Sequence, residues 1–454
     1  MLDRQAHVMS LSPGMLGLEG SREMPKFLHT ADWQWGRQYS RFAPEVAVPL
    51  AEARLQAVER LAALAVAESV DAILVAGDVF DLQTLPERQL RRLATALEGF
   101  PGPWVLLPGN HDAALAESVW QRVQRGGFWP AHALLALTPE PVLLPECRTA
   151  VLPATLPQRN PDQDTTAWMD HAETPEGWCR VGLAHGSVQG ILAEDIDSAN
   201  PIAPSRPESA RLDYLALGDW HGFKQVSDRA AYSGTPEPDR FRQNESGQVL
   251  LVEIEGPGRL PVITPRAVAL HQWLQHGQRL QDATDIDALA GWLAALPAHT
   301  VLQLTLSGRL SLEEQQRLDA VLAPHEARLR CLEVERSGLA LAPSEAELRA
   351  LPADGFVADV LWQLRSELAQ ANEALGALGS LPEPGAALTA AGPSSVAAPG
   401  SGDAARLASL QAQRDQFALS LSLLVGELQS FSGAAAASAA PAASRPELAQ
   451  EGAP

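Results

Sequence analysis

The sequence predicts a layered α/β fold that is followed by a small α+β domain and C-terminal helices. From residue 26 to about residue 255, short apolar runs of strand length alternate with stretches of helical periodicity. Most of these runs end directly at Gly, Asp or His. The chain has 454 residues, of which 46% are hydrophobic, so at least one large core is expected. Since α/β sheets bind ligands at the carboxyl ends of their strands, the polar residues there are the first candidates for a functional site.

The clearest early strands are the apolar runs at 27–30, 72–76 and 104–107, and two later runs follow at 180–184 and 214–217. Between the first two runs, apolar residues recur at helical spacing and predict a helix with one buried face: Leu55, Val58, Leu61, Ala62 and Ala65. This alternation predicts sheets that are covered by helices.

The character of the chain changes near residue 265. Residues 300–306 alternate as a strand, residues 311–322 form a helical pattern with acidic residues in the first turn, and residues 330–335 form another strand-like run. We therefore expect a layered domain over 25–265 and a small α+β domain over about 266–350.

Two helical stretches follow, at 356–378 and 404–431, separated by a Pro/Gly/Ala/Ser-rich segment at about 379–402. Their apolar faces either pack on the protein's own core or bind a partner. The region 355–431 is thus expected to be helical, with a disordered linker inside it. Residues 432–454 are rich in Ala, Pro and Ser and are expected to be disordered.

The charge of the chain limits its possible functions. A formal net charge of −21 makes a free-standing electrostatic grip on nucleic acid unexpected, because phosphate binding depends on clustered Lys and Arg. Residues 1–24 resemble neither a signal peptide nor a membrane span and are expected to be disordered or to precede the true start at Met24. The three widely spaced cysteines and the absence of a long apolar run favour a soluble cytoplasmic protein without a membrane anchor.

Metal-binding and proton-carrying side chains recur at the expected strand ends. Five segments carry them: Asp32-Trp33-Gln34, Gly77-Asp78-Val79-Phe80-Asp81, Gly109-Asn110-His111-Asp112, His185-Gly186 and Gly218-Asp219-Trp220-His221. A single Gly-Asp pair usually caps a turn, and a single His is usually a surface or core residue. The ordered series, however, offers the oxygens and imidazoles with which a pair of divalent cations holds a phosphate ester.

The series resembles the calcineurin-like metallophosphoesterases and, within them, the SbcD-type DNA repair nucleases and their Mre-family relatives. The stretch HTADWQWG at 29–36 is similar to the opening of that subfamily, and YSGTPEP at 232–238 is similar to its segment after the last ligand motif. The resemblance covers about residues 25–350. It implies a β-sandwich flanked by helices, followed by a capping domain.

The resemblance also implies roles for individual residues. One cation would be held by Asp32, Gln34, Asp78 and His221, and the other by Asp78, Asn110, His185 and Asp219. His111 would be the catalytic histidine, with Asp81 as its orienting partner.

Two of these residues depart from the family pattern, since Gln34 and Asp219 stand where the family usually has histidine. Both are expected to coordinate through oxygen, and this harder ligand set favours Mn²⁺, or else Mg²⁺, over Zn²⁺. Trp33, Trp35 and Trp220 lie beside the ligands and either pack beneath the site or stack on an unpaired base.

The function implied by the resemblance is a metal-dependent DNA nuclease, with exonuclease or endonuclease activity and a two-metal mechanism. Its partners would be DNA, an ABC-type coiled-coil ATPase of the SbcC/Rad kind and a second copy of the chain. It would act in double-strand-break repair in the cytoplasm, at the nucleoid. Two other interpretations remain open: a phosphodiesterase acting on nucleotides or small phosphoesters, and a non-catalytic scaffold of the ATPase complex.

Overall fold

A computed structural model describes residues 24–191, 200–241, 244–342 and 356–379, together with scattered positions between 406 and 424. The N-terminal extension expected before Met24, nearly all of the expected linker and the expected C-terminal tail lie outside the described residues. The chain divides into two compact units. The first unit runs through Leu274 and includes His299–Val301, and the second unit comprises Gln275–Ala298 and the residues from Leu302 onward.

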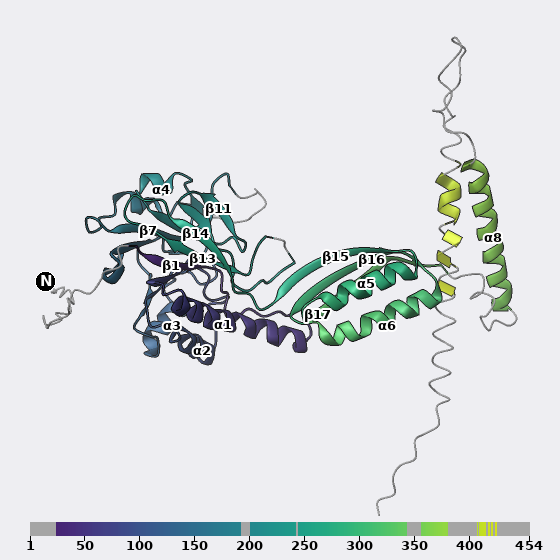
Figure 1. Cartoon of the computed structure of the whole chain (residues 1–454), viewed down its shortest axis with the longest axis horizontal. Helices are drawn as coiled ribbons and strands as arrows, with labels where there is room; N and C mark the ends of the chain where they lie inside the picture. The colour runs from purple at the N-terminus through teal and green to yellow at the C-terminus, as the bar shows by residue number, and fades with distance from the viewer. Residues whose placement is uncertain are drawn as a thin grey trace, which may run out of the picture. The chain divides into compact units, whose positions relative to one another are not determined.

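The first unit contains two six-stranded sheets (Figure 1). The first sheet has the strand order β14-β13-β1-β2-β3-β4, and β1 to β4 are parallel. Its strands are β1 (Lys26–Thr30), β2 (Ala72–Val75), β3 (Trp104–Leu106), β4 (Ala133–Leu135), β13 (Gln248–Glu253) and β14 (Val262–Ala267). The antiparallel strands β13 and β14 complete the sheet beside β1.

The second sheet has the order β11-β12-β10-β7-β6-β5, with four parallel strands between two antiparallel edge strands. Its strands are β5 (Val142–Leu144), β6 (Thr149–Pro153), β7 (Cys179–His185), β10 (Tyr214–Gly218), β11 (Lys224–Ser227) and β12 (Ala230–Tyr232). A two-stranded parallel sheet, β8 (Ser187–Val188) with β9 (Pro201–Ile202), follows β7.

The two sheets pack face to face around one apolar layer. Phe27, Leu74 and Val105 from the first sheet and Val181 and Tyr214 from the second are fully buried in the same cluster. The outer face of the first sheet is covered by three helices, α1 (Pro44–Ala67), α2 (Glu87–Leu97) and α3 (Val119–Gly126). The predicted β-sandwich flanked by helices is confirmed.

Short elements cover the outer face of the second sheet. They are η2 (Ala167–His171) and α4 (Arg206–Ser209), whereas Cys147 of η1 (Pro145–Cys147) is buried in the layer between the two sheets. Met169 from η2 and Ala210, just after α4, are fully buried in a cluster with Leu215 of β10. The sandwich therefore has an apolar layer on both sides of each sheet, which fixes the positions of the strand ends.

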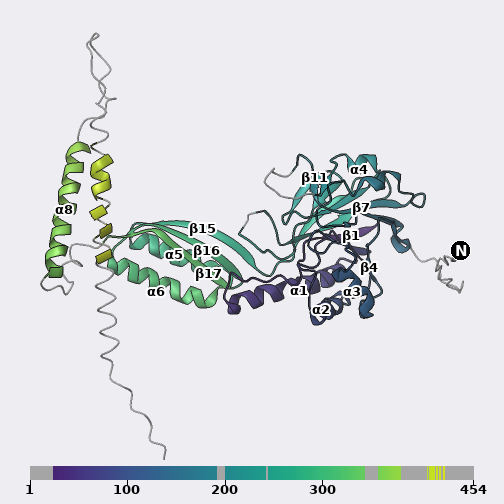
Figure 2. The same cartoon turned by 180° about the vertical axis from the view of Figure 1, so that it is seen from behind.

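The second unit is a three-stranded sheet with two helices on one face, as Figure 2 shows from behind. The strands are β15 (Gln272–Leu280), β16 (Thr300–Leu310) and β17 (Cys331–Leu341), and the helices are α5 (Ala283–Ala295) and α6 (Leu312–Arg328). Ser311 begins α6 with a capping box, since its hydroxyl accepts from the Glu314 amide while the Glu314 carboxylate accepts from the Ser311 amide.

The boundary between the units differs from the predicted one at residue 265. All of β14 (Val262–Ala267) pairs with β13, so these residues complete the first sheet, and the division falls after Leu274. The apolar pattern of β14 is weak because both of its faces are partly exposed, so the sequence gives little sign that this strand belongs to the first sheet.

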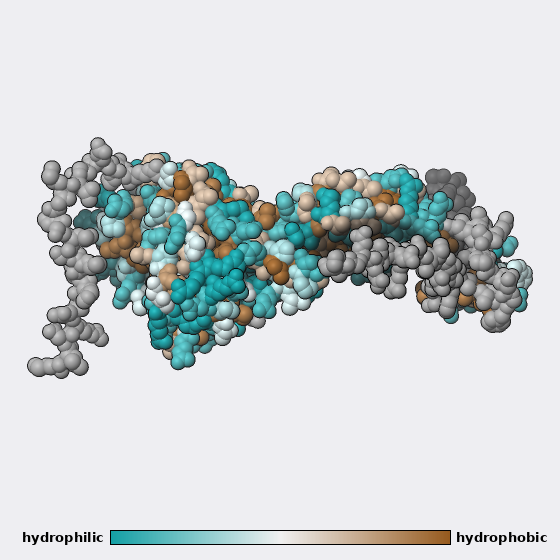
Figure 3. Space-filling view, turned by 90° about the horizontal axis from the view of Figure 1, so that it is seen from below, coloured by the Kyte–Doolittle hydropathy of each residue, from teal (hydrophilic) through white to brown (hydrophobic). Residues whose placement is uncertain are grey.

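The helix predicted at 356–378 coincides with α8 (Phe356–Gly379), which exposes Trp362 to 71%. Of the region 404–431, the structure describes only scattered helical positions between Arg406 and Leu424. Figure 3 shows one face of the molecule, where hydrophobic residues lie scattered among hydrophilic ones. Within the described residues, no helix is long and apolar enough to cross a membrane.

Candidate metal centre

The carboxyl ends of strands from both sheets meet at one edge of the sandwich. Asp32, Asp78 and Asn110 follow β1, β2 and β3, while His185 ends β7 and Asp219 comes directly after β10. The His185 ring links the two sheets, because its Nδ1–H donates to the Ala76 carbonyl at 2.8 Å. Parallel strands thus deliver the predicted side chains to one place.

The backbone at these strand ends is unusual. Asp32, Gln34, Asp78 and Asp219 all have positive φ, at 55°, 45°, 54° and 100°. Such conformations cost non-glycine residues about 1–3 kcal/mol each and concentrate at functional sites. Hydrogen bonds between neighbouring loops hold them, including Asp32 N–H to the Gly77 carbonyl at 3.0 Å and Gln34 N–H to the Asp78 carbonyl at 2.8 Å.

Asp32, Asp78 and His185 form a compact donor cluster. One ligand atom from each lies within 4.8 Å of the other two, and all three residues are buried. His185 Nε2 lies 3.3 Å from Asn110 Oδ1, 3.5 Å from Asp78 Oδ1 and 3.6 Å from Asp219 Oδ1. Asp219 Oδ2 is buried and has no hydrogen-bond partner among the described residues. Carboxylate and amide oxygens with one imidazole suit a divalent cation.

The charges in this cluster explain why it fits a cation. Burial raises the pKa of Asp32 to about 6. Burial alone would lower the pKa of His185, but the carboxylates of Asp78, Asp219 and Asp32 raise it to about 9. A bound cation would displace the His185 Nε2 proton and neutralise the same carboxylates. The bond from Nδ1 to Ala76 already orients Nε2 toward them.

The predicted catalytic pair, His111 and Asp81, lies beside this cluster. His111 Nδ1–H donates to the main-chain carbonyl of Asp81 at 3.0 Å, whereas the Asp81 carboxylate is 3.7 Å away. The Asp81 carboxylate also lies 3.8 Å from Arg37. Asp81 therefore contacts the ring mainly through its backbone. His111 Nε2 lies 4.0 Å from Asp78 Oδ2, and the side chain is 30% exposed, so it can reach a substrate.

Gln34 and His221 do not join the donor cluster. The Gln34 Oε1 atom accepts from Arg37 Nη1 at 2.8 Å, and Gln34 Nε2 lies 3.4 Å from both Asp78 Oδ2 and His221 Nε2. In this arrangement the Gln34 oxygen is engaged by Arg37, and coordination of a cation through that oxygen stays a prediction. Among the described carboxylates and imidazoles expected to hold the first cation, Asp32 and Asp78 belong to the cluster and His221 does not.

Asp239, which no sequence motif indicates, anchors this side of the site. Its buried carboxylate lies 3.3 Å from both His221 Nδ1 and Arg37 Nη2, and 2.9 Å from Arg240 Nε. Burial alone would raise the pKa of Asp239, but His221, Arg240 and Arg54 hold it well below its usual range. Asp239 is in a loop and not at a strand end, so the pattern that identified the other residues gives no signal for it.

The tryptophans of the first motif pack beneath the site. Trp33 and Trp35 are 1% and 4% exposed, so they do not provide a stacking surface. Trp33 Nε1–H donates to Thr30 Oγ1, and the ring makes an edge contact with Trp104. Trp220 is partly buried and packs on the outer cluster of the second sheet.

Part of the chain is similar to known phosphoesterases. Residues 25–221 match the family of calcineurin-like phosphoesterases. Over 94 residues the chain is 40% identical to the SbcD subunit of the nuclease SbcCD from Rhodobacter capsulatus, a match that covers 20% of this chain and about a fifth (22%) of that relative. The crystal structure of TT1561 of Thermus thermophilus covers 54% of this chain and 99% of its own, with 12% identity and a TM-score of 0.34, too low to support an argument.

Residues 25–221 are thus similar to the calcineurin-like phosphoesterases. Within that class, part of the chain is similar to the SbcD subunit.

Proposed function

We propose that this protein is a metal-dependent nuclease that hydrolyses phosphodiester bonds of DNA. The observation that carries the proposal is the buried cluster of Asp32, Asp78 and His185, with Asn110 and Asp219 beside it. The similarity to an SbcD subunit supports DNA as the substrate, since that relative is a nuclease. When bound, a divalent cation supplies Lewis-acid stabilisation of the charge that develops on the phosphate.

The protein's own residues have two roles in this reaction. The buried carboxylates and His185 bind the cation and hold it at the edge of the sandwich. His111 is the proton donor for the leaving oxygen: as an imidazolium, with Nδ1–H held by the Asp81 carbonyl, it gives up the proton on Nε2, which faces the cluster, and becomes neutral. The ligand set favours Mn²⁺, with Mg²⁺ as the alternative.

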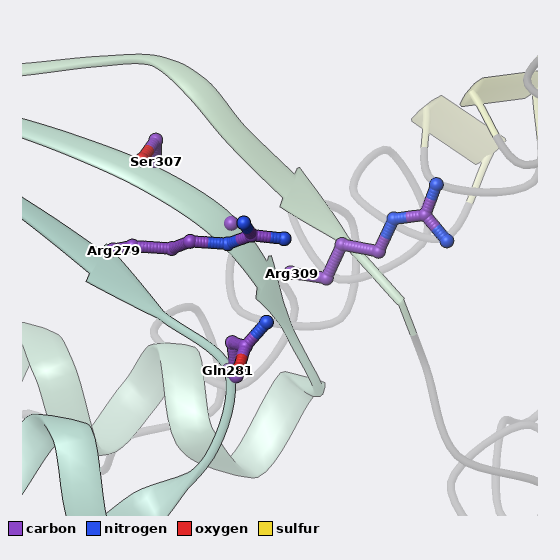
Figure 4. Close-up of a pocket in the computed structure, with 5 residues that line it drawn as sticks. Arg279, Gln281, Ser307 and Arg309 are labelled. Carbon is purple, nitrogen blue, oxygen red and sulfur yellow. The ribbon is translucent and has the colours of Figure 1, made fainter.

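The second unit offers a place for the DNA backbone despite the net charge of −21. Arg279, Gln281, Ser307 and Arg309 line a hollow of about 410 Å³ on β15 and β16. Figure 4 shows the Arg279 and Arg309 side chains extending in the same direction from neighbouring strands. Each guanidinium offers several N–H donors with a fixed geometry that matches phosphate oxygens. Two of them at one hollow can therefore contact a nucleic-acid backbone.

A close approach of the two strands builds this hollow. Gly308 has φ +120°, and a Cβ at that position would lie 1.9 Å from the Leu280 carbonyl oxygen. Only glycine permits this contact, which brings the backbone before Arg309 against the backbone after Arg279.

We further propose that the protein works in a DNA double-strand-break repair complex with an ABC-type coiled-coil ATPase, as a homodimer in the cytoplasm. The similarity to an SbcCD subunit supports the complex. The exposed Trp362 on α8 supports the helical region as the surface that binds the ATPase, since Trp is enriched at interfaces.

The net charge favours a second candidate, a phosphodiesterase for nucleotides or other small phosphoesters, because an acidic chain repels long polyanions. A third candidate is a non-catalytic scaffold of the ATPase complex. It is favoured by the contact between Arg37 and the Gln34 oxygen, because that oxygen is then not available to a metal ion.

Hydrolysis of end-labelled linear DNA with Mn²⁺, measured beside an Asp78→Ala control and a small chromogenic phosphodiester, tests these candidates. Cleavage of DNA that is lost in the control supports the nuclease. Cleavage of only the small ester supports the phosphodiesterase. If neither is cleaved, alone or with the ATPase, the scaffold is supported.

A further inference from the structure

The orientation of the Gln34 amide is fixed by its neighbour Arg37. A guanidinium has only donors, so the Gln34 atom 2.8 Å from Arg37 Nη1 must be the oxygen. The amide nitrogen is therefore the atom that lies 3.4 Å from Asp78 Oδ2 and 3.4 Å from His221 Nε2. A flipped amide would place two donors against each other at hydrogen-bond distance.

This nitrogen lies between Asp78 and His221, the two residues that would both coordinate a second cation. Asp78 is the carboxylate expected to bridge two cations, and His221 is the imidazole expected on the far side of the pair. A neutral amide N–H₂ group has no lone pair for a cation, but it can donate to both neighbours. Gln34 thus places a hydrogen-bond donor where the resemblance implies a metal ion.

Both hydrogen-bonding patterns open to the His221 ring withhold its Nε2 from a cation. If Nδ1–H donates to Asp239 Oδ2 at 3.3 Å, the Nε2 lone pair faces the Gln34 amide. If Nδ1 instead accepts from Arg240 Nη2 at 3.0 Å, the proton of the neutral ring is on Nε2, and the Gln34 amide then donates to Asp78 alone. In neither case is a free lone pair directed at a metal ion.

The charges on this side also oppose a cation. Arg37 is permanently charged, and besides Gln34 it lies 3.3 Å from Asp239 and 3.8 Å from Asp81. Arg54 and Arg240 also face Asp239. The Asp32, Asp78 and His185 cluster contrasts with this, since its donors include a buried carboxylate oxygen of Asp219 with no hydrogen-bond partner among the described residues.

We propose that the centre binds one divalent cation, held by Asp32, Asp78 and His185 with Asn110 and Asp219, and that the Arg37–Gln34 pair takes the place of a second cation. Arg37 then supplies a fixed positive charge beside the phosphate, and its side chain is 28% exposed. This inference rests on the proposed metal-dependent function but not on the identity of the substrate.

The test is to count bound metal in the full-length protein. Manganese is titrated by calorimetry, the bound ion is quantified after dialysis, and low-temperature electron paramagnetic resonance separates an isolated Mn²⁺ ion from an exchange-coupled pair. We expect one ion per chain with the signature of an isolated ion. Two ions per chain, or a coupled pair, overturn the inference while leaving metal-dependent function intact. No bound ion overturns both.

Two matched histidine variants identify the ligands without relying on activity. His185→Ala should weaken Mn²⁺ binding by more than roughly 100-fold. A loss of up to that size is typical of a residue that contacts a ligand but not the ion itself. His221→Ala should still bind one ion, because His221 offers no lone pair to it. Loss of the ion in His221→Ala, with a wild-type circular dichroism spectrum, would overturn the assignment. The wild-type count decides the stoichiometry even if one variant fails to fold.

Discussion

The Asp78 carboxylate contacts residues on both sides of the proposed centre. One of its carboxylate oxygens accepts from the His111 amide at 2.9 Å and lies 3.5 Å from His185, and the other faces Gln34. Asp78→Ala should lower phosphodiester hydrolysis by at least about 10³-fold, since a bound metal ion stabilises the transition state by several kcal/mol. Turnover of the small chromogenic ester measures this effect, with circular dichroism as the control for folding. A variant that retains the full rate would contradict the site.

Asp112, only two residues after Asn110, has a structural role instead. Its buried carboxylate accepts from the amides of Gly109 at 2.6 Å and Phe80 at 3.0 Å, and so ties two motif loops together. Asp112→Ala should lower the free energy of unfolding by about 1–3 kcal/mol for each amide left without an acceptor. Urea unfolding in chelator measures this loss. Activity per folded molecule should fall far less than in Asp78→Ala, and an equal loss in the two variants would disprove the distinction.

The sequence identified the residues at strand ends because the parallel strands of a sandwich bring them to one edge. It could not identify Asp239, which is far from Arg37 in the chain and contacts it only after folding. For the same reason the sequence could not show that Arg37 engages the Gln34 oxygen. Residue type alone left oxygen coordination by Gln34 open, whereas the contact with a donor-only neighbour shows that the oxygen is held by Arg37 in this arrangement.

Among the secondary-structure elements, β15 and β16 carry the proposed backbone contacts. Replacing Arg279 and Arg309 with Gln should weaken DNA binding and lower the salt slope by about 0.9 for each phosphate contact that is lost. Fluorescence anisotropy of labelled DNA at several salt concentrations measures both quantities. Hydrolysis of the small ester should stay unchanged, because neither arginine contributes to the metal centre.

A matched double variant, Arg317→Gln with Arg336→Gln, removes the same charge from the second unit. Those arginines lie outside the hollow and pair with Asp287 at 2.5 Å and Asp319 at 2.6 Å. Their loss should have a smaller effect on DNA binding. Equal weakening by the two pairs would show that only net charge matters and that the hollow on β15 and β16 is not a contact site.

The limits of α6 show why element boundaries were harder to predict than element types. The helix was predicted over 311–322, ending before Pro324, but it continues to Arg328. Arg328 donates to the carbonyls of Leu293 and Leu296 at the end of α5, at 2.7 and 2.6 Å. This tertiary contact stabilises the last turn despite the proline, and no local sequence pattern reveals it.

For the whole molecule, the pattern of apolar strands was sufficient to predict two domain types, because buried parallel strands require continuous apolar runs. The packing of the two sheets on each other was not predictable in the same way. It depends on buried residues such as His29 and Tyr214, which contact each other across the sandwich although 185 residues separate them in the chain.

His29 makes the stability of the sandwich depend on pH. The ring is fully buried: Nε2–H donates to the Leu217 carbonyl at 3.2 Å, and Nδ1 accepts from the Tyr214 hydroxyl at 2.8 Å. Burial lowers the pKa of His29 to about 3, against a small opposing effect of the Leu217 carbonyl. The unfolded chain therefore binds the proton first, so stability is full above pH 6.5 and is lost as the pH falls toward 3.

Between pH 7 and pH 5, this single proton should cost the native protein about 2 kcal/mol of unfolding free energy. His29→Gln removes the titrating group but keeps an amide that can bond to both neighbours, so its stability should fall by about 2 kcal/mol less over the same interval. Urea unfolding of both proteins at the two pH values, with chelator present to remove any effect of the metal, measures the difference. If both proteins lose the same unfolding free energy between the two pH values, His29 is already protonated in the folded state. That result would contradict a buried neutral imidazole between the two sheets.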